Sequence, residues 1–183
     1  MRSTKPRKMR KQFLVLCEGE TEEAYVSFLR QRYRLPIKIV SKIVRGKISQ
    51  RLIDRHKKGL YGKPSEIETF LMYDGDVLEV LNALERCNGT RLISKPCIEI
   101  WFLSHYKKAP EFNLTSDSCI KLLCAVDGWE QYKKGVLTVK QQDSLWDARM
   151  KAVLNMKQKS EVSRAFSSVY QFIEILETVK NEF

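Results

Sequence analysis

Short hydrophobic runs alternate with longer segments of helical periodicity through the first part of the chain. The runs FLVLC and IETFLMY are almost wholly apolar, which is typical of strands buried on both faces of a parallel sheet. Two further runs are rich in β-branched residues. The pattern predicts about four strands, at residues 13–17, 37–44, 67–73 and 91–94.

A segment with apolar residues at helical spacing follows each predicted strand. We expect Thr21 to cap the first helix and the second to end near Gly59. The third should cover residues 77–87, and Ser94 should cap a fourth that starts near Pro96. This alternation predicts an α/β fold with a mainly parallel sheet, right-handed crossovers and helices on both faces.

The remainder of the chain, residues 107–183, predicts a mostly helical C-terminal extension packed on the same domain. Residues 107–159 contain helical fragments without a strong strand signal. A final helix is expected over residues 160–182, with one apolar face formed by Val162, Phe166, Val169, Ile173 and Leu176. The predicted organisation is therefore a basic flexible arm (1–11), an α/β domain (12–106) and this extension.

Composition narrows the class of protein. With 183 residues, of which 43% are hydrophobic, the chain can bury one core. No run approaches the roughly 20 apolar residues of a membrane span, so no membrane partner and a cytoplasmic location are expected. The five cysteines form no CxxC pair and there are two histidines, which argues against a zinc site and a Ser/His/Asp triad.

The net charge of +11 is concentrated in the first third of the chain. Residues 1–63 hold 18 Lys and Arg against 5 Asp and Glu, and the remainder holds 15 against 17. The opening run MRSTKPRKMRK could be a solubilising arm, but basic residues recur through several elements and favour a polyanion such as DNA or RNA. The predicted nucleic-acid-binding residues are Arg7, Lys8, Arg10, Lys11, Arg45, Lys47, Arg51 and Lys95.

Acidic residues follow two of the predicted strands. Glu18 ends the first strand, with Glu22 four residues on, and Asp74 and Asp76 follow the third. Ligands gather at the carboxyl ends of parallel strands, so these carboxylates should converge if the strands are neighbours. Because carboxylates repel one another and oxygen ligands suit hard cations, the sequence predicts one or two magnesium or manganese ions.

Each acidic motif also has a simpler interpretation. The glutamates of CEGETEE could serve only the helix dipole, and Asp74-Gly75-Asp76 could be an ordinary tight turn. Glu99 lies in the apolar stretch PCIEIWFLSHY and could point to solvent. An unpaired carboxylate would be costly to bury there, so we expect Glu99 to join the metal site.

The order CEGETE, YDGD and SKPCIEIWFLSHY resembles the RloB-like proteins, which belong with the TOPRIM domains of the OLD-type nucleases. The resemblance implies a TOPRIM-like fold over residues 12–106. It assigns Glu18 as the general acid/base beside the metal, Glu22, Asp74 and Asp76 as metal ligands, and Glu99 as the matching glutamate of the third motif. Gly75 and Val77 replace residues often charged in that family, which leaves the number of ions open.

The resulting hypothesis is a magnesium-dependent endonuclease that hydrolyses DNA or RNA, with tRNA among the candidate substrates. Glu18, Asp74 and Asp76 are the expected catalytic residues. The resemblance also implies antiviral (phage) defence or a restriction-linked system. Its AAA/ABC-type ATPase partner would be a separate polypeptide, because this chain has no Walker A glycine run.

Two rival functions stay open. A TOPRIM-like subunit could bind nucleic acid or a partner without catalysis. YDGDVL also resembles the Asp-x-Asp motif of haloacid-dehalogenase phosphatases, although that family normally begins with this strand and supplies a later acidic pair.

Overall fold

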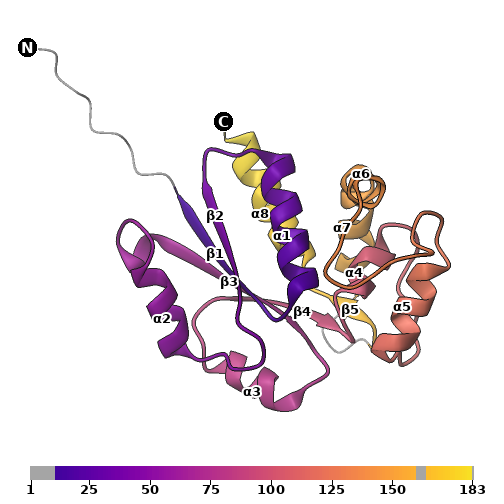
Figure 1. The fold of residues 1–183 in the computed structure, drawn as a ribbon, viewed down its shortest axis with the longest axis horizontal. Helices are drawn as coiled ribbons and strands as arrows, with labels where there is room; N and C mark the ends of the chain where they lie inside the picture. The colour runs from indigo at the N-terminus through magenta and orange to yellow at the C-terminus, as the bar shows by residue number, and fades with distance from the viewer. Residues whose placement is uncertain (1–10, 160–163, 183) are drawn as a thin grey trace, which may run out of the picture.

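The computed structural model describes residues 11–159 and 164–182, which build a five-stranded sheet with helices on both faces (Figure 1). The strand order is β2-β1-β3-β4-β5; the first four strands are parallel and β5 is antiparallel to β4. The predicted α/β class with a mainly parallel sheet is confirmed, with one strand more than expected. The strands are β1 (Gln12–Cys17), β2 (Lys38–Ile43), β3 (Ile67–Asp74), β4 (Thr90–Lys95) and β5 (Phe166–Ser167).

The helices divide between the two faces of the sheet (Figure 1). Helices α1 and α8 cover one face, and α2 and α3 cover the other. The helices are α1 (Glu20–Tyr33), α2 (Gln50–Lys58), α3 (Leu78–Glu85), α4 (Glu99–Ser104), α5 (Ser116–Cys124), α6 (Val139–Asp147), α7 (Arg149–Lys157) and α8 (Tyr170–Asn181), with a 3₁₀ turn at Pro64–Glu66.

Strand β1 supplies both hydrophobic cores because all six of its residues are buried. Phe13 and Val15 pack into the core beneath α1 and α8, whereas Leu14 and Leu16 face the core beneath α2 and α3. Successive side chains of a strand point to opposite faces, so an apolar run without alternation fits a central strand. The prediction that this run is buried on both faces is confirmed.

Two predicted helix caps are wrong. The N-cap of α1 is Gly19, and Thr21 lies inside the helix. Helix α4 begins at Glu99 with Ile98 as its N-cap, while Ser94 still belongs to β4. The hydroxyl of Ser94 is hydrogen-bonded to Ser167 in β5 at 2.9 Å, so sheet pairing uses the group that was expected to cap a helix.

The last predicted helix is correct only in its second half, where α8 carries Ile173 and Leu176. Phe166 and Ser167 form β5 instead, and Val162 lies outside the described residues. The exposed edge of β4 offers backbone groups to a passing segment, and Ser168 N donates to Ile93 O at 2.8 Å. Pairing with that edge outweighs the helical spacing of the apolar residues.

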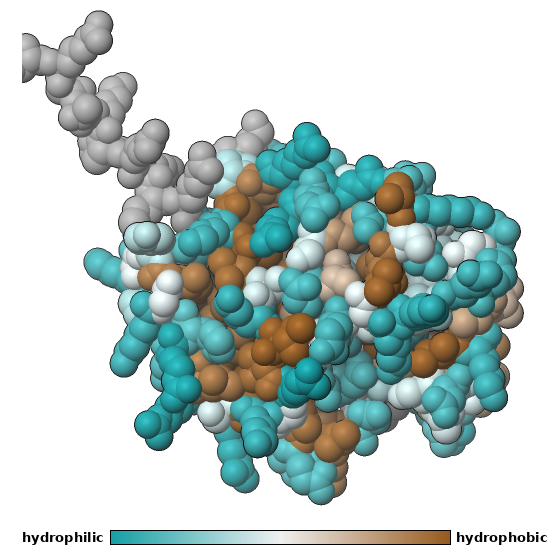
Figure 2. Space-filling view, in the orientation of Figure 1, coloured by the Kyte–Doolittle hydropathy of each residue, from teal (hydrophilic) through white to brown (hydrophobic). Residues whose placement is uncertain are grey.

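Residues 107–159 are helical as expected, forming α5, α6 and α7, and α4 packs against α5 and α7. How the chain divides into domains stays a prediction, although β5 joins the sheet and α8 covers it. No helix within residues 11–159 and 164–182 is long and apolar enough to cross a membrane. On the face shown in Figure 2, hydrophilic side chains surround smaller hydrophobic areas.

Candidate metal centre

Strands β1 and β3 bring two acidic residues to one edge of the sheet. The strands are parallel neighbours with Cys17 opposite Met72, so Glu18 and Asp74 both lie at their carboxyl ends. Oε2 of Glu18 accepts a hydrogen bond from the backbone N–H of Asp74 at 2.9 Å. The two strands are therefore neighbours, as the predicted convergence of Glu18 and Asp74 requires.

The first turn of α1 adds a third carboxylate. Glu22 is only 4% exposed, and its Oε2 accepts a hydrogen bond of 3.0 Å from the backbone N–H of Gly19. Glycine fits the N-cap because a Cβ there would lie 3.3 Å from that same oxygen. The segment EGETE thus turns sharply from β1 into α1 and directs Glu22 back toward the strand end.

Helix α4 contributes the fourth carboxylate, Glu99, which is fully buried. Oδ1 of Asp74 accepts a hydrogen bond of 3.0 Å from the backbone N–H of Ile98, which ties the end of β3 to the start of α4. Oε1 of Glu99 accepts a hydrogen bond of 2.8 Å from the hydroxyl of Tyr132. Its Oε2 has no hydrogen-bond partner among the described residues.

These four acids line one cavity of about 350 Å³. The simpler alternative, in which Glu99 points to solvent, is excluded because the side chain is buried. Lys134 and Gly135 close the cavity from a loop between α5 and α6. The complete lining is Glu18, Gly19, Glu20, Thr21, Glu22, Asp74, Ile98, Glu99, Lys134 and Gly135.

Burial, together with the charges of neighbouring acids, raises the pKa of Glu18, Glu22 and Asp74. Burial, followed by the charges of Glu22, Glu18 and Glu99, raises the pKa of Asp74 from 3.8 to about 9. Burial is also the largest cause that raises the pKa of Glu22 to about 7, and it raises the pKa of Glu18. Without a nearby cation the pocket therefore favours protonated carboxyls.

Lys134 provides part of the missing positive charge. Burial alone would lower its pKa, but Glu99, Asp74 and Glu22 outweigh that effect and raise it. Lys134 also opposes the rise in the pKa of Glu18 and Asp74. Lys134 is itself exposed, and it acts as a counter-charge at the mouth of the acidic cavity.

The acids fit a hydrated divalent cation better than a closed protein cage. Within residues 11–159 and 164–182, no group of three or more His, Cys, Asp or Glu side chains has the geometry to hold a metal ion. One oxygen of Glu18, of Glu22 and of Asp74 already accepts a backbone N–H. Magnesium commonly keeps several water ligands and binds one or two carboxylates, so the second oxygens of these acids could hold it.

Asp76, predicted as a ligand, lies apart from the other acids. It is exposed and does not line the cavity, although its charge contributes to the raised pKa of Glu18. Gly75 separates the two aspartates and is closely packed: a Cβ there would lie 2.5 Å from Cγ of Lys95 and 2.9 Å from Cγ2 of Ile93. This contact explains glycine at a position where the resemblance suggested a charge.

Thr21, Tyr132 and Lys134 were not identified from the sequence as site residues. Thr21 was interpreted only as a cap, and its hydroxyl instead accepts a hydrogen bond of 2.9 Å from the backbone N–H of Gly135. The local signal for the loop is Lys-Lys-Gly, a turn sequence, and Gly135 has a φ of 81°. That signal predicts a turn but gives no indication of what it contacts.

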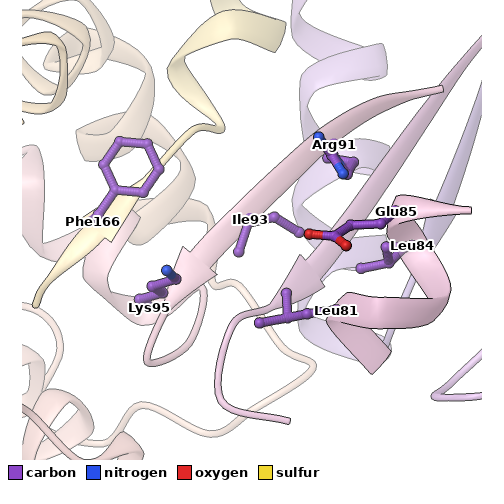
Figure 3. Close-up of a pocket in the computed structure, with 7 residues that line it drawn as sticks. All are labelled: Leu81, Leu84, Glu85, Arg91, Ile93, Lys95 and Phe166. Carbon is purple, nitrogen blue, oxygen red and sulfur yellow. The ribbon is translucent and has the colours of Figure 1, made fainter. Parts of the chain in front are cut away.

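The predicted basic residues are dispersed. Lys11 pairs with Glu68 at 2.7 Å and Arg45 with Glu20 at 3.1 Å, while Lys47 and Arg51 are exposed. Lys95 lines a smaller pocket between α3 and β4, together with Arg91, Ile93 and Glu85 (Figure 3). Arg7, Lys8 and Arg10 lie outside the described residues.

Helix α2 carries a compact basic surface, which we define as Arg51, Arg55 and Lys58. The three exposed side chains are spaced four and three residues apart, so they share one helix face over about 10 Å. Burial is the main cause that lowers the pKa of His56, and Lys42 and Arg55 lower it further. Positive potential thus extends from α2 toward β2.

A model of the family described as "RloB-like protein" matches residues 13–176 of this chain. The match covers β2 to β5, all of β1 except Gln12, and the motifs at Glu18, Asp74 and Glu99. No curated protein and no solved structure matches the chain.

Proposed function

The chain belongs to the RloB-like family, and we propose that it is a divalent-metal-dependent nuclease that hydrolyses phosphodiester bonds of DNA or RNA. The observation that carries the proposal is the convergence of Glu18, Glu22, Asp74 and Glu99 on one cavity. Four carboxyls in such a volume destabilise the fold unless a positive charge compensates them. Carboxyls with raised pKa values that converge in a cavity mark a candidate functional site.

Magnesium or manganese bound here would polarise a phosphate oxygen and activate water. Asp74 and Glu22 are the ligands that the geometry supports best, because both line the cavity, Glu22 buried and Asp74 half-buried. Glu99 adds an oxygen without a partner in the described structure. We assign Asp76 to an outer position, from which it could reach a second ion or a water ligand.

Glu18 is suited to move protons. It is partly buried, its pKa is raised, and Oε2 is held by Asp74 N. This leaves Oε1 to accept a proton from water and return it to the leaving oxygen. A carboxyl with a raised pKa is closer to the pH at which both steps are efficient.

The basic surface on α2 supports a nucleic acid as the substrate. Phosphate backbones are bound mainly through Lys and Arg, and α2 offers Arg51, Arg55 and Lys58 on one face. The helix follows β2, which ends beside Cys17 at the same sheet edge as the acids. A strand bound along α2 could therefore lead toward the cavity.

Membership of the TOPRIM group, a role in phage defence and a cytoplasmic location belong to the same proposal. The first two rest on the resemblance of the three motifs and the location on the absence of a long apolar run in the sequence; none rests on the cavity itself. The AAA/ABC-type ATPase would be a separate chain, since this sequence has no Walker A run.

Phosphatase chemistry of the haloacid-dehalogenase type fits the cavity less well. That mechanism needs Asp74 as an ionised nucleophile, yet burial and three neighbouring acids raise its pKa to about 9. Oδ1 of Asp74 is also held by the backbone N–H of Ile98. The nuclease proposal uses Asp74 as a ligand, a role in which the cation itself would keep the carboxylate ionised.

The direct test is cleavage of plasmid, single-stranded DNA and tRNA with magnesium, with manganese and with a chelator. Asp74→Asn should lower the metal-dependent rate by roughly 100-fold or more. Asp117→Asn, which changes an exposed acid in the first turn of α5, is the matched control and should keep wild-type activity. Equal activity of wild type and Asp74→Asn would refute the proposal, and nucleic-acid binding without metal binding would favour the non-catalytic subunit.

A further inference from the structure

A loop between α5 and α6, residues 129–136, closes the acidic cavity and is anchored at several points. Lys133 and Val136 form an isolated antiparallel bridge, and Val136 N donates to Lys133 O at 3.2 Å. Gly135 N donates to the hydroxyl of Thr21 in α1 at 2.9 Å. The turn is therefore held against the residues that follow β1.

Tyr132 is fixed within this loop by aromatic packing. Its ring centroid lies 5.3 Å from that of Trp129 and 6.5 Å from that of Phe102. Trp129 is held in turn, because its Nε1 donates to the hydroxyl of Tyr106 at 2.7 Å. The position of the Tyr132 hydroxyl is thus set by contacts that do not involve the acids.

The hydroxyl of Tyr132 donates to Oε1 of Glu99 at 2.8 Å, and this bond distinguishes the two oxygens of the carboxylate. The other oxygen, Oε2, is buried and has no hydrogen-bond partner in the described part of the chain. Buried polar atoms are almost always paired, and a charged one is costly to leave alone. Glu99 lines the cavity, so Oε2 belongs to an acid that already borders the proposed ion site.

We infer that Tyr132 is a positioning residue of the metal centre, whose hydroxyl holds Oε1 of Glu99 so that Oε2 remains available to a divalent cation. The inference rests on the proposed function. A group that hydrogen-bonds to a metal-binding carboxylate fixes the orientation of that carboxylate. Loss of such a group typically weakens metal binding. Through Tyr132, the C-terminal extension (residues 107–183) would thus contribute to the metal centre.

A purely structural role for Tyr132 makes a different prediction. Tyr132→Phe retains the ring that packs on Trp129 and Phe102 and removes only the hydroxyl. If the hydroxyl merely stabilised the loop, the substitution would lower the melting temperature and leave metal affinity unchanged. If it orients Glu99, metal affinity falls in a chain that is still folded.

The experiment is calorimetric titration of the full chain with Mn²⁺, comparing wild type with Tyr132→Phe. The matched control is Tyr33→Phe, which also removes a hydroxyl that donates to a glutamate at 2.8 Å, but that glutamate, Glu177, does not line the cavity. Tyr132→Phe should weaken Mn²⁺ binding about 10- to 100-fold. Tyr33→Phe should leave Mn²⁺ affinity within about twofold, with melting temperatures in chelator that are similar for the two variants.

A double-mutant cycle separates positioning from general loosening of the site. In a Glu99→Gln background, Tyr132→Phe should have little further effect on Mn²⁺ affinity, because its action passes through Glu99. Wild-type affinity in Tyr132→Phe, or an equal loss in both backgrounds, overturns the inference and leaves the proposed function intact. Failure of the wild-type chain to bind Mn²⁺ overturns both.

Discussion

Oε2 of Glu18 accepts a hydrogen bond of 2.9 Å from the backbone N–H of Asp74, which lies 56 positions further along the chain. The bond spans the ends of two parallel strands and places one acid directly against another. In the absence of a cation this arrangement opposes folding, because burial and then the neighbouring acids raise the pKa of Asp74 to about 9. The acids should therefore lower the stability of the fold when no metal is bound, and a bound divalent cation should restore it.

Asp74→Asn should raise the melting temperature in chelator at neutral pH by a few degrees. The folded pKa of Asp74 lies above its ordinary value of 3.8, so its contribution to stability is present below that value and lost as pH rises toward 9. The difference in melting temperature between Asp74→Asn and wild type should accordingly disappear at about pH 4. Magnesium should stabilise wild type and not Asp74→Asn; magnesium stabilisation of both proteins would contradict this.

Lys134→Met should lower the melting temperature in chelator and strengthen magnesium binding roughly threefold to tenfold. The lysine offsets the charges of Glu99, Asp74 and Glu22, so its removal leaves more negative potential for the ion. Lys133→Met, at the adjacent exposed position, is the control and should change neither quantity much. Weaker magnesium binding in Lys134→Met would contradict the role of Lys134 as a counter-charge that competes with the ion.

Gly75→Ala should lower the free energy of unfolding by about 1–3 kcal/mol. Its Cβ would meet Cγ of Lys95 at 2.5 Å and Cγ2 of Ile93 at 2.9 Å. Gly46→Ala is the matched control, because its Cβ would meet only Val80 at an ordinary 3.4 Å. Denaturant unfolding measures the free energy of unfolding of both variants. Equal losses would show that the close packing around Gly75 does not disfavour a side chain there.

Reversing charge on the basic surface of α2, with Arg51→Glu and Arg55→Glu together, should weaken binding to single-stranded DNA and reduce its salt dependence by about two phosphate contacts. The double variant Lys107→Glu and Lys121→Glu makes the same change in net charge at exposed positions elsewhere. Binding is measured by fluorescence anisotropy across a salt series. Equal losses in the two double variants would assign the effect to net charge alone.

His105 should make the fold sensitive to acid. The side chain is 1% exposed, and burial is the main cause that lowers its pKa from 6.5 to about 4. The unfolded chain therefore binds a proton between these values while the folded chain does not, so stability falls as pH drops through that window by about 3 kcal/mol. Relative to His105→Gln, wild type should lose stability from pH 6.5 to about 4; parallel profiles in denaturant unfolding would contradict the shift.

Much of the fold and part of the site could be predicted from local patterns. The apolar runs before Glu18 and Asp74 indicate central strands, and the carboxyl-end rule then places both acids at one edge. The contact between Gly135 and Thr21 could not be predicted, because it joins residues 114 positions apart through a turn without periodicity. Phe166 was misassigned since a two-residue strand is defined only by the edge it pairs with.

The loop of residues 129–136 also determines when the pocket can exist during protein synthesis. A ribosome releases all five acids well before Tyr132 and Lys134, so a growing chain carries the cluster without its roof or counter-charge. A gene truncated after codon 128 would encode every acid and no finished pocket. The cavity can therefore be completed only after residue 135 has been synthesised, later than every acid that lines it.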